Sequence, residues 1–323
     1  MNVHCKKLLF NTKKLTHRFV ERTSIITNKV SNSNRHHAIF HYTTEQRGFL
    51  YDPSYRLYLR NEKEEIISPF HDISLHSEDE NIYNMVVEVP RWSNAKMEVS
   101  TAETMNPIKQ DEKQGKLRFV ANCFPHHGYL WNYGCLPQTW EDPSHINIET
   151  KARGDGDPID ICEIGSRIHS TGSIIKVKLL GILCLIDEEE TDWKIIGIDV
   201  NDPCANELRN VNDIERIMPG LLNATVQWYR VYKTPFGSPP NKFGYDAKIK
   251  DVEFTYQIIN NVHQHWKNLM HKRFDTEIQR SCTTYDCEFK ISQAEAVHTV
   301  NTNPEKGNPK PYNMDVNKWY YIN

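Results

Sequence analysis

Long apolar runs are missing from this 323-residue chain. None approaches the ~18 residues that a membrane-spanning helix needs, which predicts a soluble protein. The eight cysteines are scattered without a C-x-x-C pair, and no secretory signal peptide precedes them. We therefore expect buried free thiols in a reducing compartment, and neither disulfides nor a zinc site.

Two active-site arrangements are also absent. The chain has no G-x-G-x-x-G turn between a predicted strand and a predicted helix, which argues against a nucleotide-binding α/β domain. A metal-dependent glycosyltransferase using Asp155 and Asp157 would need such a domain, so this class is disfavoured. No Ser-His-Asp arrangement is suggested, and no phosphoenzyme is expected. The adjacent His126 and His127 are interpreted as structural.

Basic and acidic residues are distributed unevenly. Residues 1–41 carry eight Lys or Arg against one acid, although the whole chain has a net charge of −3. Leucines, Phe19 and Val20 are interspersed among these bases in an amphipathic pattern. A basic, acid-poor, Ser/Thr/Asn-rich segment is typical of a mitochondrial transit peptide. We therefore expect import into the mitochondrial matrix; a nucleic-acid-binding arm, with a cytoplasmic or nuclear location, is the alternative.

The most informative stretch is the loop that begins at Gly154. It places Asp155, Asp157 and Asp160 within six residues, and its glycines and proline exclude a helix. Carboxylates this close repel each other unless cations compensate them. Oxygen ligands are typical of a hard cation such as Mg²⁺. A solvent-exposed acidic loop would give the same letters, whereas the spacing does not fit an EF-hand loop.

Two further acidic sets accompany predicted strands. The apolar run Ile174–Ile186 is followed by an acidic segment in which Asp192 and Lys194 alternate as on a strand and so share one face. Lys96 and Glu98 share a face upstream for the same reason. Each set alone is also explained by a charged turn in solvent. Together they predict metals and cations that converge on a multiply charged oxyanion.

In these motifs the chain resembles the family I soluble inorganic pyrophosphatases of animals and fungi. The resemblance runs in order from about residue 42 to about residue 270, and faintly to the end of the chain. It rests on MVVEVPRW (85–92), NAKME (94–98), GKLRFV (115–120), FPHHGY (124–129), NYG (132–134), the acidic loop (154–160) and ETDWK (190–194).

The resemblance implies an activity and a set of site residues. The activity is Mg²⁺-dependent hydrolysis of inorganic pyrophosphate to two orthophosphates by a metal-activated water, with several Mg²⁺ ions in each active site. The implied metal-binding carboxylates are Asp155, Asp160, Asp192, Asp187, Glu98 and Glu88. The implied substrate-binding residues are Arg118, Lys96, Lys194, Tyr232 and Lys233. Asp157 is the implied general base, and Tyr133 supplies a hydroxyl donor; a purely supporting role for Asp157 is the alternative.

Short strands dominate the predicted elements, which favours a mainly β fold with helices (α+β) built as a small barrel with helices outside. The resemblance implies an OB-like five-stranded β-barrel. The predicted strands are 56–59, 83–89, 96–99, 117–119, 174–186 and 193–200, and the predicted helices are 221–232 and 251–270. We expect a transit peptide over 1–41, a catalytic domain over 42–274 and a carboxy-terminal tail over 275–323. Residues 275–316 show little periodicity and are predicted to wrap the domain or to be partly disordered.

The chain departs from the family pattern at a few positions. Gly156 stands where Asn is usual, and Glu189 replaces a common Gly, which predicts a small backbone shift beside Asp187. Phe236 stands where the family has Asp, so the loop after Lys233 is expected to differ. None of these changes touches an implied ligand.

The implied assembly is a homodimer, because eukaryotic members of the family are usually homodimers. Arg91 and Trp92 are the predicted interface residues, since Arg and Trp are favoured at interface cores; Trp92 as a core aromatic is the alternative. Some animal members also serve in chromatin-remodelling assemblies, so a nuclear interaction role is the alternative function. Pyrophosphate is the expected small-molecule partner, with neither a membrane nor a nucleic acid expected.

Overall fold

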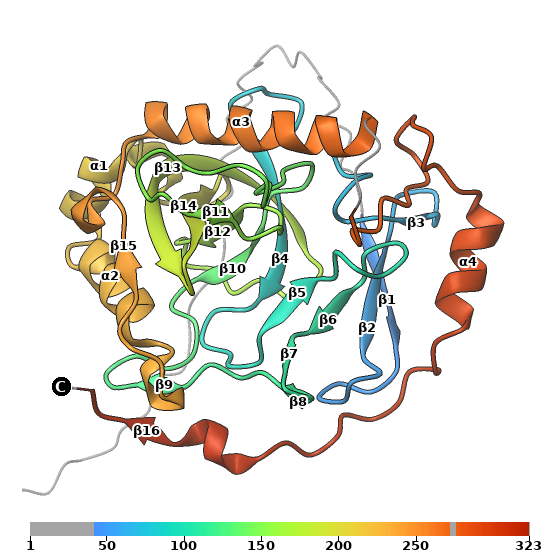
Figure 1. The fold of residues 1–323 in the computed structure, drawn as a ribbon, viewed down its shortest axis with the longest axis horizontal. Helices are drawn as coiled ribbons and strands as arrows, with labels where there is room; N and C mark the ends of the chain where they lie inside the picture. The colour runs from blue at the N-terminus through green and yellow to red at the C-terminus, as the bar shows by residue number, and fades with distance from the viewer. Residues whose placement is uncertain (1–41, 272–275, 323) are drawn as a thin grey trace, which may run out of the picture. The chain divides into compact units, whose positions relative to one another are not determined.

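The computed structural model describes residues 42–271 and 276–322 of the chain. The predicted transit peptide, residues 1–41, lies outside these residues. The central feature of the fold is a ring of strands that pair in the order β4 (Tyr83–Val89), β10 (Asn132–Cys135), β12 (Asp160–Glu163), β14 (Glu190–Asp199) and β13 (Ile174–Asp187). Pairing of β13 with β4 closes the ring (Figure 1). The expected closed five-stranded β fold with outer helices is confirmed.

Bends in two strands allow the ring to close. The register of β13 shifts beside Gly181, where a Cβ atom would lie 2.6 Å from the Lys250 carbonyl oxygen. The register of β10 shifts at Gly134, where a Cβ would lie 1.9 Å from the Val86 carbonyl oxygen. Such shifts bend a strand and increase its twist. Only glycine fits where the neighbouring backbone approaches this closely.

A second sheet packs beside the ring and carries Glu98. Its strands are β1 (Thr43–Arg47), β2 (Arg56–Arg60), β6 (Ile108–Gln110) and β5 (Met97–Val99), with β3 (Ile66–Ile67) paired to β2. The remaining strands are β7 (Glu112–Lys113), β8 (Lys116–Leu117), β9 (Asn122–Cys123), β11 (Arg153–Gly154), β15 (Lys242–Phe243) and β16 (Trp319–Tyr320).

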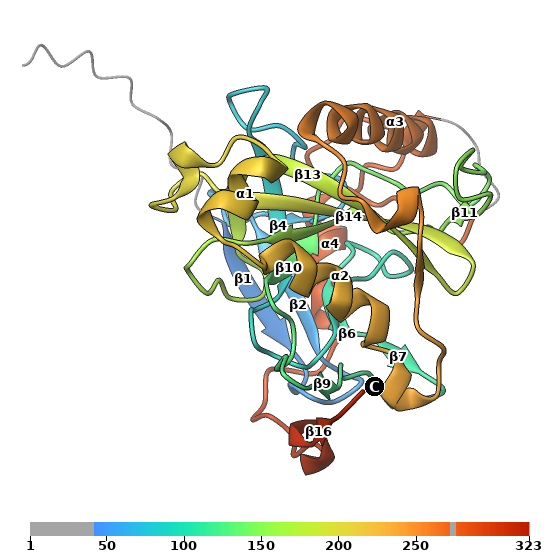
Figure 2. The same cartoon turned by 90° about the vertical axis from the view of Figure 1, so that its left-hand side faces the viewer.

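Helices cover the outside of the ring. Figures 1 and 2 show α3 (Val252–His271) along one side of it and α1 (Val211–Ile217) and α2 (Leu221–Val231) along another. The face of α3 that packs inward buries apolar side chains at helical spacing, including Ile259 and Trp266. Short 3₁₀ turns span Ala205–Glu207, Thr234–Phe236, Tyr245–Ala247 and Met314–Asn317. Among the described residues, no helix has the length and apolar character to cross a membrane.

Most predicted elements are confirmed to within a few residues. The strand prediction 83–89 matches β4 in both bounds, and the two predicted helices match α2 and α3 to within one residue. The prediction 193–200 began too late, because β14 starts at Glu190, and 117–119 overlaps the short β8 only at Leu117. Helix α1 was missed because it has only seven residues, too few for a periodic signal.

The carboxy-terminal tail contains more secondary structure than its sequence predicts. Helix α4 (Gln293–Asn301) falls inside the stretch that shows little periodicity, where no helix was predicted. Its start is fixed by a capping box in which Ser292 and Glu295 satisfy each other's backbone N–H groups. Only Ala296 and Val300 of this helix are buried. Two buried residues in nine give too weak a pattern to reveal the helix. The tail nevertheless lies along the body, because the Gly48 N–H donates to the Pro304 carbonyl and β16 pairs with β9.

Candidate active site

A cleft of about 210 Å³ is lined by residues from every strand of the ring. All of the site residues that the sequence predicted lie on its walls: Glu88, Lys96, Glu98, Arg118, Tyr133, Asp155, Asp157, Asp160, Asp187, Asp192, Lys194, Tyr232 and Lys233. His126 and His127 do not line it, which agrees with their interpretation as structural. The ring therefore gathers motifs that are separated by up to about half of the chain.

The floor of the cleft is an ion-pair network around Lys194. The parallel pairing of β12 and β14 sets Asp160 opposite Lys194, and Lys194 Nζ contacts the Asp160 carboxylate and lies 2.5 Å from Asp192 Oδ1. Tyr133 donates its hydroxyl hydrogen to Asp160. Burial opposes a charge on Lys194, but the two carboxylates hold its pKa well above the usual value. The expected shared face of Asp192 and Lys194 is confirmed.

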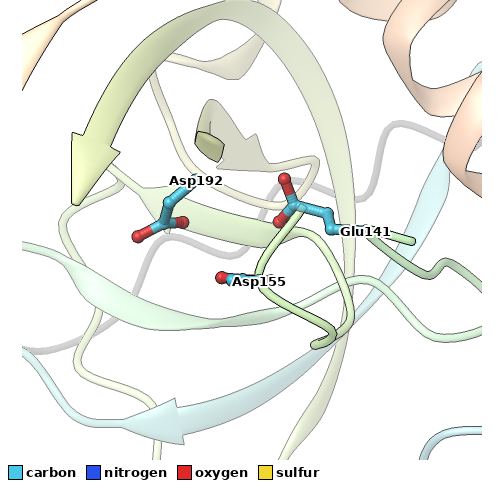
Figure 3. Close-up of side chains that lie close together, drawn as sticks. All are labelled: Glu141, Asp155 and Asp192. Atoms are coloured by element: carbon cyan, nitrogen blue, oxygen red, sulfur yellow. The ribbon is translucent and has the colours of Figure 1, made fainter. Parts of the chain in front are cut away.

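Beside this network three carboxylates face one another. Oxygen atoms of Glu141, Asp155 and Asp192 lie within 4.8 Å of each other, and Figure 3 shows the three side chains converging. Burial raises the pKa of all three well above the usual range, and each also experiences the negative charge of neighbouring carboxylates. Glu141 Oε2 is buried and has no hydrogen-bond partner among the described residues. This is the environment that a divalent cation would stabilise.

Two more carboxylates form a second acidic wall. Glu88 is buried at the end of β4, where its Oε1 accepts a 2.7 Å hydrogen bond from the Val99 N–H. Burial, reinforced by Asp160, raises the pKa of Glu88 to about 8. Desolvation by the surrounding protein atoms, followed by the negative charge of Glu98, also raises the pKa of Asp157. Asp157 is nevertheless exposed at the cleft mouth, and contact with solvent limits that shift.

Lys96 and Arg118 provide a cationic wall. Lys96 Nζ lies 2.7 Å from Glu98 Oε2 and 3.0 Å from Asp111 Oδ2, and Arg118 Nη1 also contacts Asp111 Oδ2. The shared face predicted for Lys96 and Glu98 is thus confirmed. Burial lowers the pKa of Lys96, but Glu98 and Asp111 outweigh this and raise it. Asp111 fixes the positions of both cations.

A further set of site residues, Asp187, Tyr232 and Lys233, meets at the hairpin between β13 and β14. Asp187 accepts hydrogen bonds from Tyr232 Oη at 2.7 Å and Lys233 Nζ at 2.5 Å. The hairpin turns through Glu188 and Glu189, whose φ angles are 48° and 72°. This left-handed conformation costs a non-glycine residue roughly 1 kcal/mol. Both residues of the turn carry this strain.

Sequence reasoning missed two acidic residues at the site. Asp111 positions Lys96 and Arg118, and Glu141 completes the carboxylate cluster with Asp155 and Asp192. Neither belongs to an acidic run or to a quoted motif, so no local signal pointed to them. Backbone hydrogen bonds to Lys96 and Arg118 hold Asp111 beside these two residues, and backbone hydrogen bonds to Gly156 and Asp157 hold Glu141 beside the acidic loop.

Comparisons with known proteins agree with this geometry. The family model described as inorganic pyrophosphatase matches residues 85–267. The chain is 49% identical to the human inorganic pyrophosphatase over 286 residues, which is 87% of this chain and 98% of that protein. It is 48% identical to the Drosophila melanogaster inorganic pyrophosphatase over 289 residues, covering 88% and 86% of the two chains. The solved inorganic pyrophosphatase of Schistosoma japonicum superposes with a TM-score of 0.83 at 44% identity, covering 87% of this chain and all of that one.

The closed ring carries a cleft whose acidic and cationic walls suit metal ions and an anion made of phosphate groups. The class of protein is a hydrolase. The chain belongs to the inorganic pyrophosphatase family, and within it to the eukaryotic, family I type.

Proposed function

We propose that the chain hydrolyses inorganic pyrophosphate to two orthophosphates with Mg²⁺ as the cofactor. The observation that carries the proposal is the division of one cleft into a carboxylate wall and a cationic wall. Pyrophosphate carries several negative charges and has no apolar part. A site for it needs cations on all sides, some from side chains and some from metal ions held by carboxylates.

The residues present fit a hard divalent cation. The unpartnered oxygen of Glu141 and the raised pKa values of Asp155 and Asp192 mark a cluster whose negative charge Lys194 compensates only in part. The ligands we assign to the ions are Asp155, Asp160, Asp192, Asp187 and Glu98, with Glu88 in support. Carboxylate oxygens without a His or thiolate favour Mg²⁺ over softer metals. Bound divalent ions would neutralise phosphate oxygens and lower the pKa of water.

Asp157 is the proposed general base. It lies among the ligand carboxylates but is not in the convergent Glu141 cluster, and its side chain is exposed to the cleft mouth. A base in this position can take a proton from the attacking water and release it to solvent. The raised pKa brings the Asp157 carboxylate closer to neutral pH, where a general base works best.

The cations act on the phosphates. Arg118 presents a planar guanidinium suited to two phosphate oxygens, and Lys96, Lys194 and Lys233 provide single charges. Hydroxyl groups of Tyr133 and Tyr232 would donate hydrogen bonds to phosphate oxygens. Each of these groups is already held by a carboxylate, so little reorganisation is required when the anion arrives.

A phosphate-release assay tests this function. Pyrophosphate and Mg²⁺ should give two orthophosphates for each substrate molecule, and a chelator should abolish release. Ca²⁺, whose coordination is larger and looser, should bind but support little turnover. An aryl phosphate monoester serves as the control substrate. Equal turnover of that ester, or full activity with the chelator, would contradict the proposal.

We also propose that the protein is a homodimer. Trp92 is 56% exposed, so it is not a core aromatic, and His127 beside Trp92 lies 5.9 Å from the ring of Trp319. Phe124, 58% exposed, lies 5.8 Å from the same Trp319 ring. Exposed aromatic side chains gathered in this way are typical of an interface. Sedimentation of wild type and Trp92→Ala tests this: a monomeric wild type, or an unweakened variant dimer, would refute it.

The division into a transit peptide over 1–41, a catalytic domain over 42–274 and a tail over 275–323 remains our proposal. Its support is the positive charge of residues 1–41 and a family match that starts at residue 85. A reporter fused to residues 1–41 should enter the mitochondrial matrix and lose this segment. A reporter that stays in the cytosol would refute import. None of the comparisons adds support for the nuclear interaction role.

A further inference from the structure

Two cysteines in the loop after α3 lie in direct contact. The sulfur atoms of Cys282 and Cys287 are 3.3 Å apart. Cys282 is fully buried, whereas Cys287 is partly exposed. Within residues 42–271 and 276–322 no other pair of cysteine sulfurs makes such a contact. The other cysteines there are Cys123, Cys135, Cys162, Cys184 and Cys204.

The backbone holds these two residues at the ends of one turn. Cys282 donates its N–H to the Phe289 carbonyl at 3.4 Å, and the Ile291 N–H donates to the Cys282 carbonyl at 2.8 Å. The Lys290 N–H donates to the Cys287 carbonyl at 3.2 Å. A disulfide requires the sulfurs to approach by only roughly 1 Å from their present separation. The two cysteines lie in the turn, outside every strand and helix.

The turn between the cysteines anchors the tail to the body of the protein. Backbone N–H groups of Thr283, Thr284 and Tyr285 all donate to the Asp72 carboxylate, at 2.7 to 3.0 Å. The Thr283 hydroxyl also donates to the Ile66 carbonyl at 2.7 Å. Any bond that restrains this turn therefore restrains the attachment of everything that follows it, including α4.

We propose that Cys282 and Cys287 are a modification site, at which a small-molecule disulfide such as glutathione disulfide converts them into a reversible intramolecular disulfide that secures the tail. The modification is independent of the proposed hydrolysis. Neither cysteine lines the cleft, so the bond should leave turnover unchanged.

The partly exposed thiol of Cys287 reacts first. Cys287 loses its proton to solvent, and its thiolate attacks one sulfur of glutathione disulfide, which forms a mixed disulfide and releases one glutathione. Burial, followed by the hydrogen bond to Cys287, raises the pKa of Cys282 above its usual range, so Cys282 stays protonated until then. It next gives up its proton and attacks the Cys287 sulfur, releasing the second glutathione. Two thiols lose two electrons and two protons, and one glutathione disulfide becomes two glutathiones.

The experiment equilibrates the full-length chain in glutathione buffers of stepped ratio, traps free thiols with an alkylating agent and identifies peptides by mass spectrometry. The expected product is a single internal disulfide between Cys282 and Cys287, reversed by dithiothreitol. Cys204 is the matched internal control, because it is partly exposed, contacts no other sulfur of the described residues, and should not acquire an internal partner. The readout uses wild type, so it does not depend on the folding of any variant.

A second measurement tests the restraint. Limited proteolysis of the tail should slow roughly tenfold on oxidation, because the bond removes freedom from the detached turn. Cys287→Ser should abolish the slowing, whereas Cys204→Ser should retain it. A glutathione that persists on Cys287, two thiols that stay free in oxidising buffer, or equal cleavage of the oxidised and reduced chains would overturn the proposal.

Discussion

Carboxylates at two places in this molecule, under the tail and in the cleft, have opposite electrostatic surroundings. Asp72, under the tail, accepts hydrogen bonds from the N–H groups of Ser68, Thr283, Thr284 and Tyr285, which take the place of water around its carboxylate. Asp155 and Asp192, in the cleft, are crowded by other carboxylates, and burial raises their pKa values well above the usual range. The first arrangement stabilises the fold, and the second keeps negative charge available for cations that arrive later. Substitutions at the two places should therefore separate stability from activity.

The largest expected effect is on catalysis. Asp157→Asn keeps the shape of the side chain but removes the proposed proton acceptor, so kcat should fall by about 10²- to 10⁴-fold. The unfolding midpoint should not fall, because a charge leaves a crowded acidic site. Steady-state phosphate release and thermal unfolding measure the two quantities. Glu149→Gln, an exposed carboxylate outside the cleft, is the control; near-normal turnover of Asp157→Asn would remove Asp157 from the role of base.

The reverse pattern is expected under the tail. Asp72→Asn places an amide NH₂ group against N–H donors, so the free energy of unfolding should fall by roughly 2–4 kcal/mol. The kcat of the folded fraction should stay near the wild-type value. Chemical denaturation and phosphate release test this, with the exposed Asp286→Asn from the same turn as the matched control. A stable but inactive Asp72→Asn would break the separation between the two groups.

A pH effect should arise next to Asp72. His71 is fully buried; its Nε2 lies 3.0 Å from the Gln279 carbonyl, and its Nδ1 accepts a hydrogen bond from Trp266 at 3.0 Å. The contact with Trp266 requires an unprotonated Nδ1 and therefore the neutral ring, whose Nε2–H donates to the Gln279 carbonyl. Burial lowers the pKa of His71 to about 4, below its value near 6.5 in the unfolded chain. Its contribution to stability is therefore present above pH 6.5 and is lost as the pH falls toward 4.

The contribution of His71 should amount to roughly 1–3 kcal/mol over this interval. Carboxylates titrate in the same range, so the quantity to measure is the difference between wild type and His71→Gln. Denaturation at several pH values should show a steeper loss for wild type than for the variant. Parallel curves would show that His71 has no part in the acid sensitivity.

The sequence predicted the residues that line the cleft better than it predicted the neighbouring residues that complete the site. Alternation along strands places Lys96 with Glu98, and Asp192 with Lys194, because side-chain direction in a strand is a local property. Glu141 was not predictable in this way. Its position beside Asp155 depends on backbone hydrogen bonds to Gly156 and Asp157, which no local pattern encodes.

The tail shows a similar limit. The capping box at Ser292 is a readable signal, but the short helix that follows buries too little apolar surface to give a periodic pattern. The turn that contains Cys282 and Cys287 is held by backbone donors to Asp72, a contact between residues more than two hundred positions apart. The sequence predicts free thiols, but it could not show that Cys282 and Cys287 touch.

Titration calorimetry of Mg²⁺ into the metal-free chain tests the central claim most directly. If the crowded, only partly compensated carboxylates in the cleft hold the cofactor, Asp192→Asn should weaken Mg²⁺ binding roughly tenfold or more, because it removes a charged ligand. Glu149→Gln and Asp72→Asn should bind like wild type as long as they are folded. Equal Mg²⁺ affinity in wild type and in folded Asp192→Asn would contradict the account.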